Sequence, residues 1–205
     1  MKLTIKNNLL RIIITGLCLA ICFLLWFTIM PYFTHRTTPK TNVATVITNA
    51  PILKPFSLID TKGQDFTNSS LRGHWTLIFF GYAKCPDICP RTLNIIKESW
   101  QIFNTTQQRV PVKFVFADIN TNQVDNKYLS TFLHNYNAEF LGVSGPTQNM
   151  RDFSDQLGIY ATSNGEKIDH TATLLLLNPY GKLYAIFSPP FSAQDIVHDL
   201  EILTL

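Results

Sequence analysis

The chain has 205 residues, of which 46% are hydrophobic and 15% are charged. This length and composition are enough for one globular domain of ordinary size plus additional segments, and they exclude an intrinsically disordered protein. The formal net charge of +3 comes partly from basic residues on either side of one apolar segment, not from a basic surface stripe. The charge pattern therefore gives no support to nucleic-acid binding.

That apolar segment runs without a charge from Ile12 to Met30. Together with Leu9 and Leu10 it would form a helix of about 33 Å, long enough to cross the hydrocarbon core of a bilayer. We therefore predict a transmembrane anchor over residues 9–30. A cleaved signal peptide is the alternative, but the apolar run is longer than the usual signal-peptide core and no small-x-small cleavage pattern follows it.

Basic residues set the expected orientation of this anchor. Lys2, Lys6 and Arg11 lie before its uncharged stretch, so the positive-inside tendency leaves residues 1–8 in the cytoplasm, or in the matrix of an organelle, and the large C-terminal part on the other side of the membrane. Arg36 and Lys40, on the far side, reduce the asymmetry. Because the N-terminus is too short for a transit peptide, we expect a single-pass protein of the bacterial inner membrane with its C-terminal domain in the periplasm.

Residues 31–50 are rich in Thr, Pro and Asn, a composition typical of a flexible tether. Residues 51–205 have the composition of a globular domain. Continuous apolar runs predict buried strands, and helical spacing of apolar residues predicts helices. The expected strands are 56–60, 74–80, 110–119, 171–177 and 182–187, and the expected helices are 90–103, 128–136, 150–157 and 194–203. This order of strands and helices predicts an α/β domain of the thioredoxin-like class.

Two cysteines follow the strand at 74–80 directly. Cys85 and Cys89 lie in the sequence Gly-Tyr-Ala-Lys-Cys-Pro-Asp-Ile-Cys-Pro, with a proline after each cysteine. Proline disfavours the helical conformation for the residue before it, so the pair is expected in a loop, with the helix beginning just after Cys89. The N–H groups at the start of a helix favour a thiolate and lower the cysteine pKa.

Several kinds of dithiol site have this spacing. A stabilising disulfide closed over so short a loop would contribute roughly 2 kcal/mol, the low end for a crosslink. A peroxidase would carry a hydroxyl residue three positions before its reactive cysteine, where Tyr82 and Pro86 stand instead. A structural zinc site needs four ligands, and the other two cysteines, Cys18 and Cys22, lie within the predicted anchor.

His170 is the candidate for a third member of the site. It comes just before the strand at 171–177, which in a thioredoxin-type fold packs beside the strand leading to the cysteines. Thioredoxins place a proline there, and this chain has none between Thr147 and Pro179, which argues against a general disulfide exchanger. Two thiolates and an imidazole suit Cu(I), and with an added ligand Cu(II). On sequence alone, a single histidine is more often a structural or exposed one.

Three acidic residues are further candidates around this site. Asp87 lies between the cysteines and is a candidate helix cap, while Asp118 and Asp169 are candidate acceptors behind the ligands, with a structural role as an equal alternative. The remaining histidines are interpreted as solvent-facing or structural: His35, His74, His134 and His198.

These motifs resemble those of a known family. The cysteine stretch with Leu93, the sequence Asp169-His170-Thr171, and Asn178-Pro179-x-Gly181 are similar to the SCO/SenC family of membrane-anchored cytochrome c oxidase assembly proteins, over roughly residues 55–203. The resemblance implies a thioredoxin-like fold, a copper ion bound by Cys85, Cys89 and His170, and a role in maturing the dinuclear copper centre of a membrane-bound oxidase subunit. The upstream copper donor stays unknown.

One motif departs from the family's pattern. The family usually shows Val-Asp-Pro-x-Arg-Asp after the second strand, whereas residues 117–122 read Ala-Asp-Ile-Asn-Thr-Asn. The three expected ligands, Cys85, Cys89 and His170, are all present. The departure therefore concerns recognition of the client protein and not metal binding. Two functional hypotheses follow: a tethered copper chaperone, or a thiol–disulfide reductase that keeps the cysteines of the acceptor reduced so that copper can enter.

Overall fold

The computed structural model describes residues 14–28, 30, 40–105, 110–120, 125–160 and 172–204. By internal contacts the chain divides into two units, Met1–Thr38 and Pro39–Leu205. In the first unit, residues 14–28 are helical. No helix in the described ranges combines the length and the apolar character needed to cross a bilayer. Residues 9–13 and 29 of the predicted anchor lie outside those ranges, so the anchor stays a prediction.

The second unit is built on one mixed sheet of eight strands. Its strands are β1 (Ala44–Val46), β2 (Ser57–Asp60), β3 (Asp65–Thr67), β4 (Trp75–Gly81), β5 (Val112–Asp118), β6 (Leu141–Ser144), β7 (Leu174–Leu177) and β8 (Leu183–Phe187). They lie in the order β1-β8-β7-β4-β5-β6-β2-β3. Strand β5 pairs in parallel with β4 and β6, and the other pairs are antiparallel. The prediction of a mixed α/β, thioredoxin-like fold is confirmed at this level.

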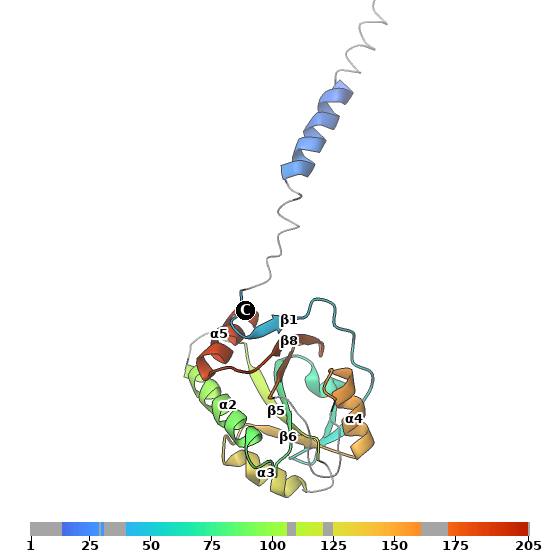
Figure 1. Cartoon of the computed structure of the whole chain (residues 1–205). Coiled ribbons are helices and arrows are strands. Elements are labelled where there is room, and N and C mark those ends of the chain that lie inside the picture. Colours follow the sequence, from blue (N-terminus) through green and yellow to red (C-terminus); the bar gives the residue numbers. More distant parts are fainter. Residues whose placement is uncertain are drawn as a thin grey trace, which may run out of the picture. The chain divides into compact units, whose positions relative to one another are not determined.

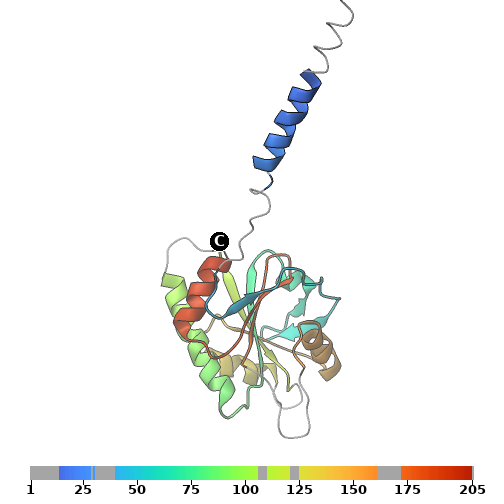
Figure 2. The ribbon, with the colours of Figure 1, turned by 45° about the horizontal axis from the view of Figure 1, so that its top comes forward.

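Four α-helices and one 3₁₀ turn complete the part of the unit that the structure describes. They are η1 (Asn68–Leu71), α2 (Ile88–Thr105), α3 (Asn126–His134), α4 (Thr147–Gln156) and α5 (Ala193–Leu203). Helices α2 and α5 lie side by side on one face of the sheet and α4 covers the other (Figures 1 and 2). The sheet is therefore covered on both faces, as parallel strands require.

Strand β4 explains why the apolar run at 74–80 shows no alternation. All seven of its residues are buried. Leu77 and Phe79 point into the core under α2 and α5, whereas Ile78 and Phe80 point into the core under α4. Because successive side chains of a strand point to opposite faces, a strand covered on both faces favours apolar residues throughout, and Thr76 is the buried polar exception in β4.

The structure differs from the sequence-based expectation at three strands, of which β3 is the hairpin partner of β2. Strand β1 lies inside residues 31–50, which were expected to be tether, and β6 was not expected. Both are short, with three and four residues, and they carry too few apolar residues for a periodicity to emerge. They are stabilised by pairing with β8 and β5, which lie far away in the sequence. The ordered unit therefore begins before Pro51.

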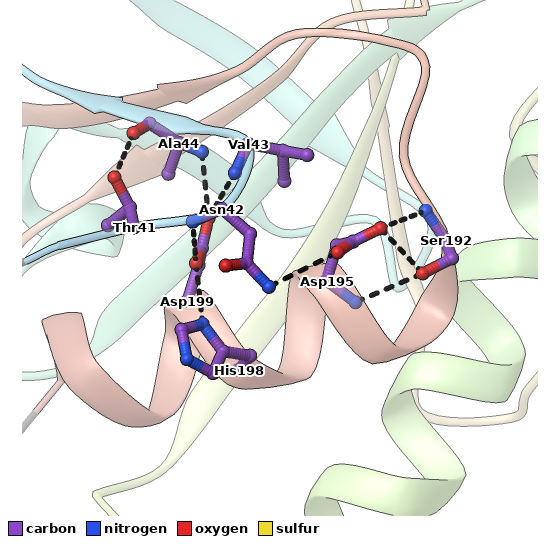
Figure 3. Close-up of polar contacts among 8 residues, drawn as sticks. All are labelled: Thr41, Asn42, Val43, Ala44, Ser192, Asp195, His198 and Asp199. Carbon is purple, nitrogen blue, oxygen red and sulfur yellow. Dashed lines mark hydrogen bonds and ion pairs between the residues drawn. The ribbon is translucent and has the colours of Figure 1, made fainter.

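A buried carboxylate attaches β1 to helix α5. Asp199 is 0% exposed, and its two oxygens accept the backbone N–H groups of Asn42 (2.7 Å), Val43 (2.9 Å) and Ala44 (2.7 Å). The Nδ1 atom of the half-exposed His198 lies 3.0 Å from the same carboxylate (Figure 3). Burial alone would raise the pKa of Asp199, but these hydrogen bonds outweigh burial and lower it.

The first turn of α5 adds a second contact with the same segment. Ser192 and Asp195 form a capping box, in which the Ser192 hydroxyl accepts the Asp195 N–H (3.2 Å) and the Asp195 carboxylate accepts the Ser192 N–H (3.0 Å). The Asn42 side-chain amide donates to the Asp195 carboxylate over 3.2 Å (Figure 3). Helix α5 thus holds the beginning of the ordered unit at two places, one buried and one exposed.

Asp199→Asn should lower the free energy of unfolding by about 2 to 3 kcal/mol, because an amide has one acceptor oxygen and cannot accept all three N–H groups, of which that of Ala44 is buried. Since the folded state lowers the pKa of Asp199, its contribution is present above the unfolded pKa of about 3.9 and is lost as the pH falls through the folded pKa. Urea unfolding of the full chain in mild detergent, at several pH values, measures both effects.

The matched control is Asp155→Asn, since Asp155 is exposed at the end of α4. It should change the free energy of unfolding by less than about 0.5 kcal/mol. Equal stability of the two variants at pH 7 would contradict a structural role for the Asp199 carboxylate.

Candidate metal centre

The cysteine pair lies between the end of β4 and the first turn of α2. Strand β4 ends at Gly81, and the N–H of Cys85 donates to the Tyr82 carbonyl (3.0 Å), which closes a turn. Helix α2 begins at Ile88, so the expectation that it begins after Cys89 was wrong by two residues. Pro90 is accommodated because the first N–H groups of a helix have no acceptor within it. Cys89 therefore lies inside the helix.

The Cys89 sulfur lies directly against Gly81. A Cβ atom added at Gly81 would lie 2.9 Å from Cys89 Sγ and 3.0 Å from the Phe116 ring. The distance to the sulfur is too short for a real Cβ atom and the distance to the ring is tighter than most real contacts, so the missing side chain is what leaves room for the sulfur. Phe116 belongs to β5, and Gly81 pairs with Asp118 of that strand. One point of packing thus joins the ends of two parallel strands to the first turn of α2.

Cys85 is the cysteine whose thiolate is favoured. Its side chain is 8% exposed, and its sulfur accepts the Cys89 N–H over 3.4 Å. Burial raises the pKa of Cys85, but hydrogen bonds from the N–H groups of Cys89 and Asp87 and from the side chains of Cys89 and Tyr82 together outweigh burial and lower the pKa. The expected effect of the helix start on the cysteine pKa is found at this residue.

For Cys89 the same expectation was wrong. Its side chain is fully buried, and burial raises its pKa well above the ordinary range, with further increases from its interaction with Cys85 and from the carboxylate of Asp118. Burial removes the water that would solvate a thiolate, and the sequence contained no sign of this burial. The two thiols are not joined in a disulfide. The pair is therefore electrostatically asymmetric, with one favoured thiolate and one favoured thiol.

Asp118, a predicted acceptor behind the ligands, lies beside the cysteine loop. It is 0% exposed, and burial raises its pKa to about 6, opposed by hydrogen bonds from the N–H groups of Asn120 and Ala83. The Asn120 contact is 3.1 Å long and reaches one carboxylate oxygen. The other oxygen, Oδ2, is buried without a hydrogen-bond partner among the described residues. Asp118 thus places a buried, incompletely bonded carboxyl group close to Cys89.

Two tyrosines interact with the cysteines, and sequence reasoning gave neither of them a role. Tyr82 donates a hydrogen bond to Cys85, and burial and the Cys85 charge both raise its pKa. Tyr136, just after α3, has its pKa raised by burial and by the nearby Cys89. The position of Tyr82 three residues before Cys85 was a usable signal. No local signal pointed to Tyr136, which reaches the site through the folding of α3.

The other predicted residues have mixed outcomes. The Asp87 carboxylate forms a 2.8 Å ion pair with Arg91, and both side chains are largely exposed, so the pair contributes little to stability. His170 and Asp169 lie outside the described residues. Among the described residues, no three His, Cys, Asp or Glu side chains are grouped so that they could hold a metal ion. The assignment of His170 as a ligand stays a prediction.

Strand β7 is nevertheless located as the prediction for His170 requires. It pairs with β4 in antiparallel register, with Leu174 opposite Phe79 and Leu177 opposite Thr76. Strand β7 therefore begins at the end of the sheet where β4 runs into the cysteine loop.

Gly81→Ala should lower the free energy of unfolding by about 1 to 3 kcal/mol, because the new methyl group overlaps Cys89 Sγ and the Phe116 ring. Urea unfolding of the full chain measures the loss. Gly16→Ala is the control: it makes the same substitution in a helix, where nothing lies within 4 Å of the added Cβ atom. If the two variants were equally stable, the close contact between Gly81 and Cys89 would be wrong.

Solved structures share this architecture. A ScoI protein of Bradyrhizobium japonicum, solved with copper bound, superposes with a TM-score of 0.64 at 28% identity, covering 75% of this chain and 99% of that one. An Arabidopsis thaliana ScoI, also solved with copper bound, gives a TM-score of 0.67 at 22% identity over 72% of this chain and 94% of that one. At that lower identity, the second likeness shows the fold alone.

Curated relatives agree with the structural likeness. A SCO2-like protein of Rickettsia prowazekii is 31% identical over 150 residues, which cover 70% of this chain and 72% of the relative. A SCO2-like protein of Rickettsia typhi is 29% identical over 206 residues, covering 95% of this chain and 98% of the relative. The sequence profile of the SCO1/SenC family matches residues 44–204. With the cysteine loop at the end of β4 and the fold that carries it, this match shows that the chain belongs to the SCO1/SenC family.

Proposed function

We propose that this protein is a membrane-tethered copper chaperone that binds copper through Cys85, Cys89 and His170 and assists maturation of the copper centre of cytochrome c oxidase. The observation that carries the proposal is the cysteine loop itself. It holds two thiols that are not joined in a disulfide, and the sulfur of one accepts the N–H of the other over 3.4 Å.

The donor atoms fit copper. Thiolate sulfur is a soft ligand that favours Cu(I), and an imidazole nitrogen added to two sulfurs extends the range to Cu(II) when a further ligand is present. Cys85 is already favoured as a thiolate. Cys89 has a raised pKa, so it gives up a proton when it becomes a ligand, and copper loading should strengthen as the pH rises. The copper-bound relative from Bradyrhizobium japonicum supports the same metal.

The position of β7 supports His170 as the nitrogen ligand. His170 precedes Leu174 by four residues, and Leu174 pairs with Phe79 near the end of β4. Strand β7 therefore begins at the end of the sheet that carries the cysteine loop.

The membrane part of the proposal rests on the N-terminal segment. We infer a cytoplasmic N-terminus over residues 1–8, an anchor over 9–30, and a tether that ends before β1, with the domain in the periplasm of a bacterium. The described helix over residues 14–28 exposes large apolar side chains. They include Leu19 at 72%, Phe23 at 65% and Phe27 at 70%. A tether would raise the effective concentration of the domain near a membrane-bound oxidase subunit without any new contact.

His170→Ala should weaken Cu(II) binding by at least about tenfold, because loss of a ligand should cost no less than loss of a residue that supports one, while both thiols stay reactive. Equilibrium dialysis of the reduced full chain with copper, together with the visible absorption of the complex, measures this. His134→Ala is the matched control, because His134 is exposed in the last turn of α3. Equal copper binding by wild type and His170→Ala would remove His170 from the site.

A second candidate function, a thiol–disulfide reductase, is favoured by one observation: the opposite pKa shifts of the two cysteines. The Cys85 thiolate would attack a disulfide of the acceptor, forming a mixed disulfide and releasing one acceptor thiolate. Cys89 would then attack the Cys85 sulfur and release the second acceptor thiolate. The acceptor gains two electrons, and the Cys85–Cys89 pair becomes a disulfide.

Cys89→Ser should trap the mixed disulfide, because Cys85 can still attack but nothing resolves the adduct. Non-reducing electrophoresis and mass spectrometry of the full chain from bacterial cells detect it. Cys85→Ser is the control and should trap little, since burial keeps Cys89 protonated. If the wild-type chain bound copper normally and Cys89→Ser trapped no adduct, the reductase would be rejected and the chaperone would remain.

A further inference from the structure

Tyr82 forms hydrogen bonds with both cysteines of the candidate metal centre. Its carbonyl accepts the N–H of Cys85 over 3.0 Å, and its own N–H donates to the Cys89 sulfur. Its side-chain hydroxyl donates to the Cys85 sulfur. One residue thus holds the backbone of the first cysteine and the sulfur atoms of both. Because Tyr82 is not one of the three proposed ligands, it acts on a bound metal through these sulfurs.

The end of β4 fixes the position of Tyr82. The residue follows Gly81, which pairs with Asp118 of β5 and whose carbonyl accepts the N–H of Ile119 over 2.9 Å. Its ring packs against the part of the core that contains both cysteines. Donors held on such a rigid support need no rearrangement when negative charge develops on a sulfur.

Copper binding changes the set of donors at the Cys85 sulfur. In the metal-free chain this sulfur accepts the N–H of Cys89 over 3.4 Å and hydrogen bonds from the side chains of Cys89 and Tyr82. The Cys89 thiol donates only while it carries its proton, and it gives up that proton when it becomes a ligand. A tyrosine hydroxyl is protonated at neutral pH. Of the two side-chain donors, Tyr82 is therefore the one that remains in the copper-loaded site.

A hydrogen bond to a coordinated thiolate draws electron density away from the sulfur. Cu(II), which has the higher charge, depends on that density more than Cu(I) does, so the hydrogen bond favours Cu(I). Hydrogen bonding around a cysteine ligand is one of the features that tune the redox potential of copper sites, and groups behind the ligands commonly act in this way.

We propose that Tyr82 is a positioning residue that sets the oxidation state of copper favoured by the site: its hydroxyl, bonded to the Cys85 sulfur, shifts the balance of affinities toward Cu(I). This inference rests on the proposed function, because it concerns copper held by Cys85 and Cys89. The same hydrogen bond also stabilises the dithiol of the metal-free chain against the disulfide, since a disulfide sulfur carries no charge and is a weaker acceptor than a thiolate.

The test removes the hydroxyl and keeps the ring, with Tyr82→Phe. Anaerobic titration of the full chain in mild detergent, against a Cu(I) chelator and separately against a Cu(II) chelator, gives the two affinities. The ratio of Cu(I) affinity to Cu(II) affinity should fall by at least about threefold, the scale of one net hydrogen bond. The sulfur-to-copper charge-transfer band of the Cu(II) form should move to longer wavelength, because the sulfur then holds its electrons less tightly.

Two further chains separate this electronic effect from a loss of structure. Incorporation of 3-fluorotyrosine at position 82 makes the hydroxyl a stronger donor, so the band should move the other way, to shorter wavelength. Tyr180→Phe is the matched control, since Tyr180 is 78% exposed in the turn between β7 and β8. This control should leave both the band and the affinity ratio unchanged.

A metal-free measurement tests the hydrogen bond without copper. In glutathione buffers the Cys85–Cys89 dithiol becomes a disulfide while one oxidised glutathione becomes two reduced molecules. Tyr82→Phe should shift this equilibrium toward the disulfide by at least about threefold, and Tyr180→Phe should leave it in place. A smaller shift for Tyr82→Phe would show that the hydroxyl does not stabilise the Cys85 sulfur, and would overturn the proposal.

The copper titration distinguishes failure of this inference from failure of the proposed function. A wild-type chain that bound no copper would reject the proposed function and this inference with it. If the wild type bound copper, three results would reject the role of Tyr82 alone: a ratio changed by less than about threefold in Tyr82→Phe, an unmoved band in that variant, or a fluorotyrosine band that moved to longer wavelength.

Discussion

The contact between the Cys89 sulfur and Gly81 is the constraint on which the candidate site depends. It joins the end of β4 to the first turn of α2, with the Phe116 ring of β5 on the other side. Because β4 is buried along its whole length, its end has a fixed position in the sheet. The contact therefore also fixes the position of the first turn of α2, and with it the loop that joins β4 to α2. Cys85 is then oriented by the N–H of Cys89.

The same contact produces the asymmetry of the two thiols. Packing against Gly81 buries Cys89 completely, and burial is the largest cause of its raised pKa. Cys85 lies one turn earlier, where N–H groups at the start of α2 donate to its sulfur and lower its pKa. Asp118 adds a buried carboxyl group beside the pair. This arrangement suits a soft-metal site, and it also suits a redox pair in which Cys85 is the nucleophile and Cys89 the resolving thiol. The His170→Ala and Cys89→Ser experiments therefore distinguish copper transfer from disulfide reduction.

The two ends of the sheet have different chemistry because its strands differ in length. Strands β4 and β5 have seven residues each. At their carboxyl ends, β4 leads into the cysteine loop and β5 ends at Asp118. At the other end, the four-residue β6 leaves part of β5 unpaired and opens the cavity lined by Lys113 and Trp100. At the outer edge, β1 is held by Asp199 of α5. One sheet thus provides a candidate metal site at one end, a cavity at the other, and the edge on which β1 is held.

The sequence by itself determined the fold class, the cysteine loop and the family. The apolar run before Gly81 predicted a strand covered on both faces, and the prolines after Cys85 and Cys89 restrict the loop locally. Tertiary structure alone decided the burial of Cys89, the contact of Tyr136 with the site, and the short strands β1 and β6. The physical reason is distance along the chain. Proline and apolar periodicity act on near neighbours, whereas burial and strand pairing are set by residues such as Phe116 and Asp199, which reach their partners only in the folded chain.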